Sequence, residues 1–371
     1  MRDTTMLRRN MFALLTVAAW LFLMPPPAPA QYGNQGSSPA SQQKTRKTPA
    51  MREQVYNKFA AAQEAIETGD EATAEDVLGD VQRMKNLNSY EVAMMWNTYA
   101  YIYYSQEKYS QAIDAYKNVL AQEELPYSLE HTTIFALAQL YFVSEDYRTA
   151  IDYMNQWFKV AENPGPDAYI IVGQAHYALE DYRGGLPYVE RAVAIAKERG
   201  REVRENWYLL LRAMYWELDD MPKVRDVLIE LLTHWPKKQY WTQLAAIYGE
   251  MDDEKRQLAA YEAAYFQGGL TRGSEMLTLA NLYLYHEVPY RAAVILEDGM
   301  REGKIEATSY NLRTLAQAWA DAKEMHKAIP ALERAARVSD DGDIYAELGN
   351  ILVDQEEWEA AEAAASKALN K

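Results

Sequence analysis

Residues 105–120 read SQEKYSQAIDAYKNVL, and the same half-helix returns twice further along the chain. SEDYRTAIDYMNQWF follows at 144–158, and QEEWEAAEAAASKAL stands at 355–369. Each copy carries an aromatic residue followed three places later by alanine, as at Tyr109 and Ala112. Residues three places apart lie on the same side of an α-helix, so the spacing predicts helices that pack through the same face in every copy.

The pattern extends over most of the chain as nine copies, spaced 33 to 39 residues apart. Each copy reads as two amphipathic helices, here named helix A and helix B, joined by a short polar turn. A bulky residue opens helix A and a small residue follows four places later, as at Trp96 and Ala100. The copies begin near Val55, Ala93, His131, Pro166, Glu205, Lys238, Ser274, Ser309 and Gly342.

Paired helices with a period of about 34 residues are typical of the tetratricopeptide repeat, and the chain resembles that family over about 55–371. The resemblance implies an all-α fold, a solenoid of about nine helix-turn-helix repeats wound into a right-handed superhelix. Small residues let the two helices of a pair approach closely, and aromatic residues fill the gap to the next pair. Because no single pair buries its own apolar face, stacking of neighbours supplies the stability.

Some positions depart from the pattern. Val224 and Gln257 stand where helix B of copies five and six should carry a small residue, and Arg212 is also off-pattern. Pro187 and Pro330 fall inside predicted B helices. Proline removes a backbone hydrogen bond from a helix interior, so we expect a kink or a late helix start at both prolines.

The N-terminal part of the chain differs from the repeats. Arginines precede the apolar run MFALLTVAAWLFLM (11–24), and a small-x-small cleavage site ends at Ala30. Because this run is short for a membrane span, the order predicts a signal peptide over 1–30, cleaved after Ala30. The alternative is an uncleaved N-terminal anchor. Residues 31–50 are rich in Gln, Ser and Pro and predict a disordered linker before the repeat domain at 51–371.

Composition excludes several classes of function. Acidic residues outnumber basic ones 54 to 38, a net charge of −16, which argues against nucleic acid because phosphate binding needs a basic face. The chain has no cysteine, which excludes disulfides, thiol chemistry and a lipid-modified N-terminal cysteine. No stretch after the signal peptide is long and apolar enough to span a bilayer. The oligomeric state stays open.

No catalytic, metal or cofactor motif stands out, so we expect a non-enzyme with no cofactor and no metal. Five histidines are scattered without metal-ligand spacing, and no Gly-rich phosphate loop is present. Paired aspartates stand at predicted turns, where aspartate caps the following helix rather than serving acid–base chemistry. These pairs are Asp219–Asp220, Asp252–Asp253 and Asp340–Asp341.

In the tetratricopeptide family the concave wall is lined by helix A residues that do not pack between helices. Amides donate to and accept from a peptide backbone, and aromatic rings offer contact area at low entropy cost, so such a wall suits a peptide segment. The alternative is that a tightly wound superhelix buries these aromatic residues against each other. The predicted partner-binding residues are Tyr56, Phe59, Gln63, Asn97, Tyr101, Tyr104, Phe135, Gln139, Phe142, Asp167, Gln174, Tyr177, Asn206 and Trp216.

Residues 202–251 carry a further resemblance, through the segments NWYLLL, WELDDM and HWPKKQYWTQLAAIYGEM. They are similar to exported tetratricopeptide proteins of Gram-negative bacteria that are encoded beside TonB, ExbB and ExbD components. The resemblance implies a periplasmic adaptor that binds a protein or peptide partner of the TonB, ExbB and ExbD system. Two alternatives are a general periplasmic scaffold for secretion, pili or polysaccharide export, and a carrier for a lipid or small ligand.

Overall fold

The computed structural model describes residues 49–340 and 342–371, and over these residues the chain forms eighteen helices and no strand. The predicted all-α class with nine helix pairs is confirmed. The predicted signal peptide and nearly all of the predicted linker lie outside the described residues. None of the described helices is long and apolar enough to cross a membrane.

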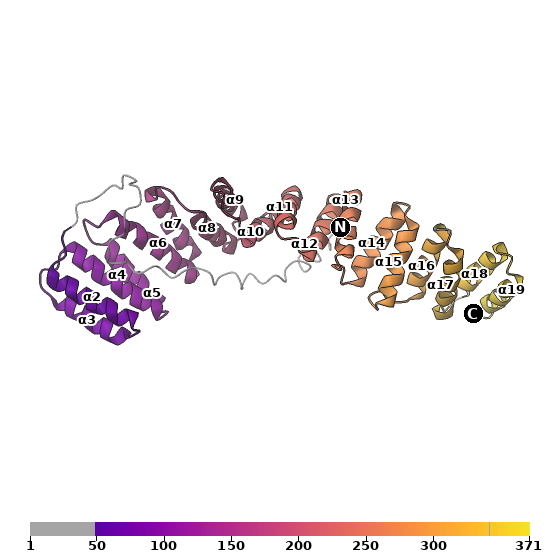
Figure 1. Cartoon of the computed structure of the whole chain (residues 1–371), viewed down its shortest axis with the longest axis horizontal. Coiled ribbons are helices and arrows are strands. Elements are labelled where there is room, and N and C mark those ends of the chain that lie inside the picture. Colours follow the sequence, from indigo (N-terminus) through magenta and orange to yellow (C-terminus); the bar gives the residue numbers. More distant parts are fainter. Residues whose placement is uncertain (1–48, 341) are drawn as a thin grey trace. The chain divides into compact units, whose positions relative to one another are not determined.

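Contacts divide the chain into two units, one ending at Ile195 and the other beginning at Ala196. In the first unit, helices A and B alternate in chain order (Figure 1). Within it, α4 packs on α5 and α6 on α7, and both B helices also contact the next helix A. The helices are α2 (Glu53–Glu67), α3 (Glu71–Arg83), α4 (Ser89–Ser105), α5 (Tyr109–Leu120), α6 (Tyr127–Val143), α7 (Tyr147–Val160), α8 (Pro166–Ala178) and α9 (Tyr182–Glu198), which carries the boundary.

The second unit repeats the same plan through five helix pairs, each packed on the next (Figure 1). Its core runs from Ala264 to Ala364 as one continuous apolar cluster. The helices are α10 (Glu205–Glu217), α11 (Met221–His234), α12 (Lys238–Glu250), α13 (Glu254–Phe266), α14 (Gly273–Tyr285), α15 (Pro289–Arg301), α16 (Ser309–Asp321), α17 (Met325–Val338), α18 (Asp343–Asp354) and α19 (Trp358–Leu369).

The small residues predicted between helices A and B are buried, and one pair shows why they must be small. Ala100 and Ala112, on α4 and α5, have no exposed surface. A Cβ atom added to Gly173 on α8 would lie 2.3 Å from Cγ2 of Val189 on α9. That distance is far inside van der Waals contact, so any side chain at this position would push the two helices apart.

Two of the off-pattern positions have a structural explanation. Gln257 fits on α13 because the small residue has moved to the opposite helix: a Cβ on Gly249 would lie 2.3 Å from Gln257 Nε2. Arg212 is half-buried, and its guanidinium donates a hydrogen bond to Gln243 on α12. Val224 is buried in α11 with 1% of its surface exposed.

Both interior prolines lie within unbroken helices, so the predicted late helix start is wrong. Pro187 is inside α9, which begins at Tyr182, and Pro330 is inside α17, which begins at Met325. Each is therefore the sixth residue of its helix. At this position proline removes one backbone hydrogen bond and leaves the first turn intact, which limits the loss of helix stability.

Every turn between helix A and helix B has the same backbone conformation. One residue in each turn has a positive φ, between 55° and 78°. In the α4–α5 turn, the N–H of Glu107 donates to the Tyr104 carbonyl and the N–H of Lys108 to the Tyr103 carbonyl, at 3.0 and 2.8 Å. This hydrogen-bond pair is the Schellman motif. The positive-φ residues are Gly69, Glu107, Glu145, Glu180, Asp219, Asp252, Glu287, Lys323 and Glu356.

Replacing Glu107, Glu145 and Glu180 together with glycine should stabilise the first unit by about 1–2 kcal/mol. The left-handed conformation costs a non-glycine residue about 1–2 kcal/mol, which exceeds the extra chain entropy that glycine loses on folding. The three sites are well separated, so their effects should add. The measurement is the denaturant midpoint followed by circular dichroism. Glu64→Gly, an exposed position inside α2, is the control and should lower stability by about 1 kcal/mol.

Two of the predicted aspartate pairs stand at these turns, and both cap the following helix as predicted. Asp220 accepts a hydrogen bond from the Lys223 N–H, and Asp253 accepts one from the Arg256 N–H, each at 3.2 Å. The preceding aspartate of each pair takes the positive-φ position. The third pair is not tested, because Asp341 lies outside the described residues; α18 itself has Gly342 at its N-cap.

Candidate partner-binding surface

Twelve of the predicted partner-binding residues lie in the first unit, and the structure separates them by exposure. Tyr56 and Asp167 are exposed, with 49% of the Tyr56 surface accessible. Seven are half-buried. These are Gln63, Asn97, Tyr101, Tyr104, Phe135, Gln174 and Tyr177.

The remaining three, Phe59, Gln139 and Phe142, belong to the core, so their assignment to an open wall is wrong. Their exposed fractions are 2%, 8% and 3%. Phe59 packs in the cluster formed by the first helix pairs. Gln139 and Phe142 lie on α6, which is apolar around most of its circumference and is covered on more than one side.

Three predicted wall aromatics pack across the turn onto the residue that opens helix B. The ring pairs are Tyr104–Tyr109, Phe142–Tyr147 and Tyr177–Tyr182, with centroids 6.0, 5.3 and 5.3 Å apart. The two members are five residues apart in every case. Such ring contacts stabilise a fold beyond the area they bury. These rings therefore pack within their own helix pair and not, as the alternative of a tightly wound superhelix expected, on one another. The five-residue spacing was the signal for this contact in the sequence.

A larger group of rings, the α6–α9 aromatic cluster, was not predicted apart from Phe135. At its centre Trp157 packs on Phe135 and His131, with centroids 5.0 and 4.9 Å away. Phe158 extends the cluster to Tyr169 at 4.7 Å. In the sequence, the consecutive Trp157 and Phe158 at the end of helix B were the signal for this cluster. The cluster consists of His131, Phe135, Trp157, Phe158, Tyr169, His176 and Tyr188.

The centre of this cluster is uncharged at neutral pH. Burial lowers the pKa of His131 below its ordinary value, so the imidazole stays neutral. Trp157 is 8% exposed, and its indole Nε1 has no hydrogen-bond partner among the described residues. At the edge, His176 Nδ1 lies 2.8 Å from Asp181 Oδ2. The Gly184 N–H and His176 together lower the pKa of that carboxyl.

Tyr101 and Asn97 form a half-buried neighbouring pair within the predicted surface. They are four residues apart on α4 and therefore lie on one face of that helix. Below them the Tyr116 hydroxyl is buried, which raises its pKa, and the nearby phenols of Tyr104 and Tyr101 raise it further. On α8, Gln174 and Tyr177 are likewise half-buried neighbours on one face.

In the second unit, Asn206 and Trp216 are both half-buried, and two tyrosines of this unit are hydrogen-bonded to carboxylates. The Tyr208 hydroxyl donates to Glu230 at 2.6 Å, linking α10 to α11. Tyr283 donates to Glu262 at 2.7 Å, linking α14 to α13. These hydrogen bonds join helices, so Tyr208 and Tyr283 serve the packing of this unit. No three acidic or histidine side chains in the described residues are grouped to hold a metal.

Residues 96–121, which cover the second half of α4, the turn and α5, match the family model of the tetratricopeptide repeat. Over these residues the fold is a tetratricopeptide helix pair. No curated protein sequence matches the chain.

Several solved tetratricopeptide structures are similar in fold. One from Parabacteroides merdae is 17% identical, with a TM-score of 0.40, over 81% of this chain and 98% of that one. YrrB, described as a TPR protein with an unusual peptide-binding site, is 14% identical, with a TM-score of 0.39, over 50% and 90% of the two chains. The TPR2AB domain of yeast Sti1, in complex with pHSP90, is 15% identical, with a TM-score of 0.36, over 64% and 89%.

Proposed function

We propose that this chain is an exported, non-catalytic adaptor whose tetratricopeptide array binds a segment of a protein partner. The observation that carries the proposal is the face of α4 bearing Asn97 and Tyr101, where an amide and a phenol remain partly accessible while their neighbours are packed. An amide pairs with a peptide backbone, and a half-exposed tyrosine offers a rigid contact. The tetratricopeptide match of residues 96–121 covers this same segment.

We further propose that the adaptor works in the periplasm and that its partners belong to a TonB, ExbB and ExbD system. The order of arginines, apolar run and cleavage site in residues 1–30 supports export. The resemblance of residues 202–251 to exported tetratricopeptide proteins supports the TonB system. Cross-linking in the native host followed by purification would identify the partner. TonB or ExbD segments are the expected result. Secretion or polysaccharide-export components without any TonB-system protein would favour the general scaffold, and a co-purifying lipid would favour the carrier.

Asn97→Ala combined with Tyr101→Ala should weaken binding of the captured partner by about 10-fold or more, because central tyrosines often dominate an interface. The affinity would be measured by titration with the purified partner segment. Thermal unfolding should change little, since both side chains are only half-buried. Tyr310→Ala is the matched control: that ring is 76% exposed, lies in the second unit and should leave affinity unchanged. Unchanged binding by the double variant would contradict the assignment of this face.

A further inference from the structure

The face of α4 proposed to bind a partner segment continues as a straight ridge toward the end of that helix. Asn97, Tyr101 and Ser105 follow one another at four-residue intervals, so they lie one turn apart on the same side of α4. Asn97 and Tyr101 are half-buried, and Ser105 is exposed. The ridge from Asn97 to Ser105 is about 12 Å long, the length of about four residues of extended chain.

Two carboxylates of α3 converge on the end of this ridge. Ser105 Oγ donates a hydrogen bond to Glu71 Oε1 at 2.8 Å. Gln106 Nε2 donates to Glu71 Oε2 at 2.8 Å and to Glu75 Oε1 at 3.1 Å. One amide nitrogen therefore holds both carboxylates, and all of these donors are neutral. Within the part of the chain that the structure describes, no basic side chain forms an ion pair with either carboxylate.

The A helices that carry the candidate surface of the first unit are also poor in basic residues. Together α2, α4, α6 and α8 have six acidic residues and one basic residue, whereas α3, α5, α7 and α9 have eight and seven. The one basic residue, Lys58, pairs with Asp80 on α3 at 2.8 Å. A surface with an excess of one sign of charge attracts ligands of the opposite sign. The A helices therefore attract cations more strongly than the B helices.

Tyr101 provides a further contact for a cation, because a tyrosine ring attracts a positive charge placed over its face. The chain makes this contact itself on the next A helix, where Lys117 Nζ lies 5.5 Å from the ring centre of Tyr141. No lysine or arginine among the described residues lies over the Tyr101 ring. A cation from a partner would therefore meet no competing side chain there.

We propose that the partner segment bound along α4 is basic, with an arginine or lysine that binds Glu71 and Glu75 together. This inference rests on the adaptor function proposed above and specifies the chemistry of the segment. If the backbone of the segment pairs with the Asn97 amide, the cation follows about four residues later along an extended chain. Arginine fits best, because its planar group carries several N–H donors and can bind both carboxylates.

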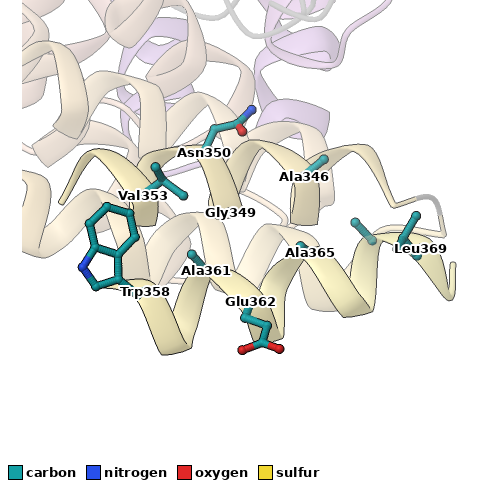
Figure 2. A pocket seen from close by; sticks show the side chains of 10 residues that line it. Ala346, Gly349, Asn350, Val353, Trp358, Ala361, Glu362, Ala365 and Leu369 are labelled. Carbon is teal, nitrogen blue, oxygen red and sulfur yellow. The ribbon is translucent and has the colours of Figure 1, made fainter. Parts of the chain in front are cut away.

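The groove between α18 and α19, in the second unit, is a different kind of surface. It has a volume of about 530 Å³. Figure 2 shows alanines along its length, with Trp358 near one end and Leu369 at the other. Glu362 is the single acidic residue among those that line it. The groove lacks paired carboxylates, so it serves as a reference surface when binding of a basic segment is measured.

Labelled peptides of about ten residues, long enough to cover the ridge, test the charge preference by fluorescence anisotropy. The peptides alternate serine with arginine, with lysine or with glutamate, and the exported protein is purified from its host. The arginine peptide should bind at least about 10-fold more tightly than the glutamate peptide. Raising the ionic strength from about 0.05 to about 0.3 M should reduce this difference. No binding of the arginine peptide, or equal affinity for the glutamate peptide, would overturn the proposal.

Glu71→Gln combined with Glu75→Gln locates the binding site. The affinity for the arginine peptide should fall about 10-fold or more. Thermal unfolding should change little, because a glutamine oxygen can still accept the hydrogen bonds from Ser105 and Gln106. A role in packing alone would give the opposite result, a lower unfolding temperature with unchanged affinity.

Two control variants separate this site from the net charge of the chain and from the groove. Asp114→Asn combined with Asp152→Asn removes the same amount of charge from exposed positions on α5 and α7. Glu362→Gln removes the carboxylate of the groove. Both variants should bind the arginine peptide as the natural chain does. A loss of affinity as large as that of the Glu71 and Glu75 variant would contradict the assignment to α3 and α4.

The Asn97→Ala and Tyr101→Ala variant distinguishes failure of this inference from failure of the proposed function. The affinity of the partner segment captured by cross-linking should fall in this variant and also in the Glu71 and Glu75 variant. If it fell only in the former, the α4 face would bind a partner, but the segment would not be basic. If it fell in neither, the proposed surface itself would be wrong.

Discussion

Trp319→Ala should lower the free energy of unfolding of the second unit by about 3–5 kcal/mol, the range measured when large aromatic residues are removed from protein cores. Trp319 lies on α16 and is 2% exposed. Its ring contacts Tyr290 of the preceding pair edge-on, with centroids 5.3 Å apart. Lys327 of α17 lies 4.2 Å above the same ring. Removing the Trp319 side chain would therefore eliminate contacts that α16 makes with α15 and with α17.

The loss should be visible as a lower denaturant midpoint and as faster amide hydrogen exchange in α14 to α17. Repeat arrays unfold in parts, so exchange locates the change where a single midpoint does not. Tyr310→Ala on the same helix is the control. Its ring is 76% exposed, and its removal should change stability by no more than about 0.5 kcal/mol. Equal effects of the two substitutions would mean that Trp319 does not link neighbouring pairs.

Glu91→Gln should lower the free energy of unfolding of the first unit by about 2–3 kcal/mol, the cost of leaving buried polar groups unpaired. The Glu91 side chain has no exposed surface. It accepts hydrogen bonds from Arg52 Nε and Nη2 at 2.9 and 2.7 Å. It also accepts from the backbone N–H groups of Arg52 and Asn88 at 2.9 and 3.0 Å. In Glu91→Gln, the NH₂ group of the glutamine amide would face some of these N–H donors. Two donors cannot hydrogen-bond to each other, so these groups would be left unpaired.

The same site predicts a dependence on pH. Burial disfavours the ionised form of Glu91, but the hydrogen bonds from Arg52 outweigh it and hold the pKa below its ordinary value of 4.5. The stabilisation is therefore present above about pH 4.5 and is lost as the pH falls through the lowered folded value. Denaturant midpoints between neutral and acid pH should show this loss in the natural chain and a weaker loss in Glu91→Gln. Glu53→Gln, at an exposed position of α2, is the control and should keep the pH profile of the natural chain. If the control instead showed the profile of Glu91→Gln, the assignment of the acid loss to Glu91 would be refuted.

The repeat spacing predicted the fold well because it records the packing between helices, which every pair must satisfy. Helix starts were less predictable. Copies two and three were expected to begin near Ala93 and His131, but α4 and α6 begin at Ser89 and Tyr127. For α4 a signal was available, because Asn88 and Glu91 form a capping box, the pattern typical of a helix N-terminus.

The candidate surface was less predictable than the fold because position within a repeat does not determine exposure. Gln139 and Gln174 occupy equivalent positions in neighbouring copies, yet Gln139 is buried and Gln174 is half-buried. The difference depends on the side chains that cover each helix from neighbouring pairs. The α6–α9 cluster shows the same limit, because it joins residues from four helices that no single repeat contains.

The hydrogen bonds between Arg52 and Glu91 also decide how a mechanical load would enter the molecule. Arg52 precedes α2, yet it is fastened through its backbone and its side chain to α4. A pull on the chain before Arg52 would therefore load α4 through these hydrogen bonds as well as α2 through the backbone. The load on α2 would thereby be shared with the second helix pair for as long as these hydrogen bonds hold.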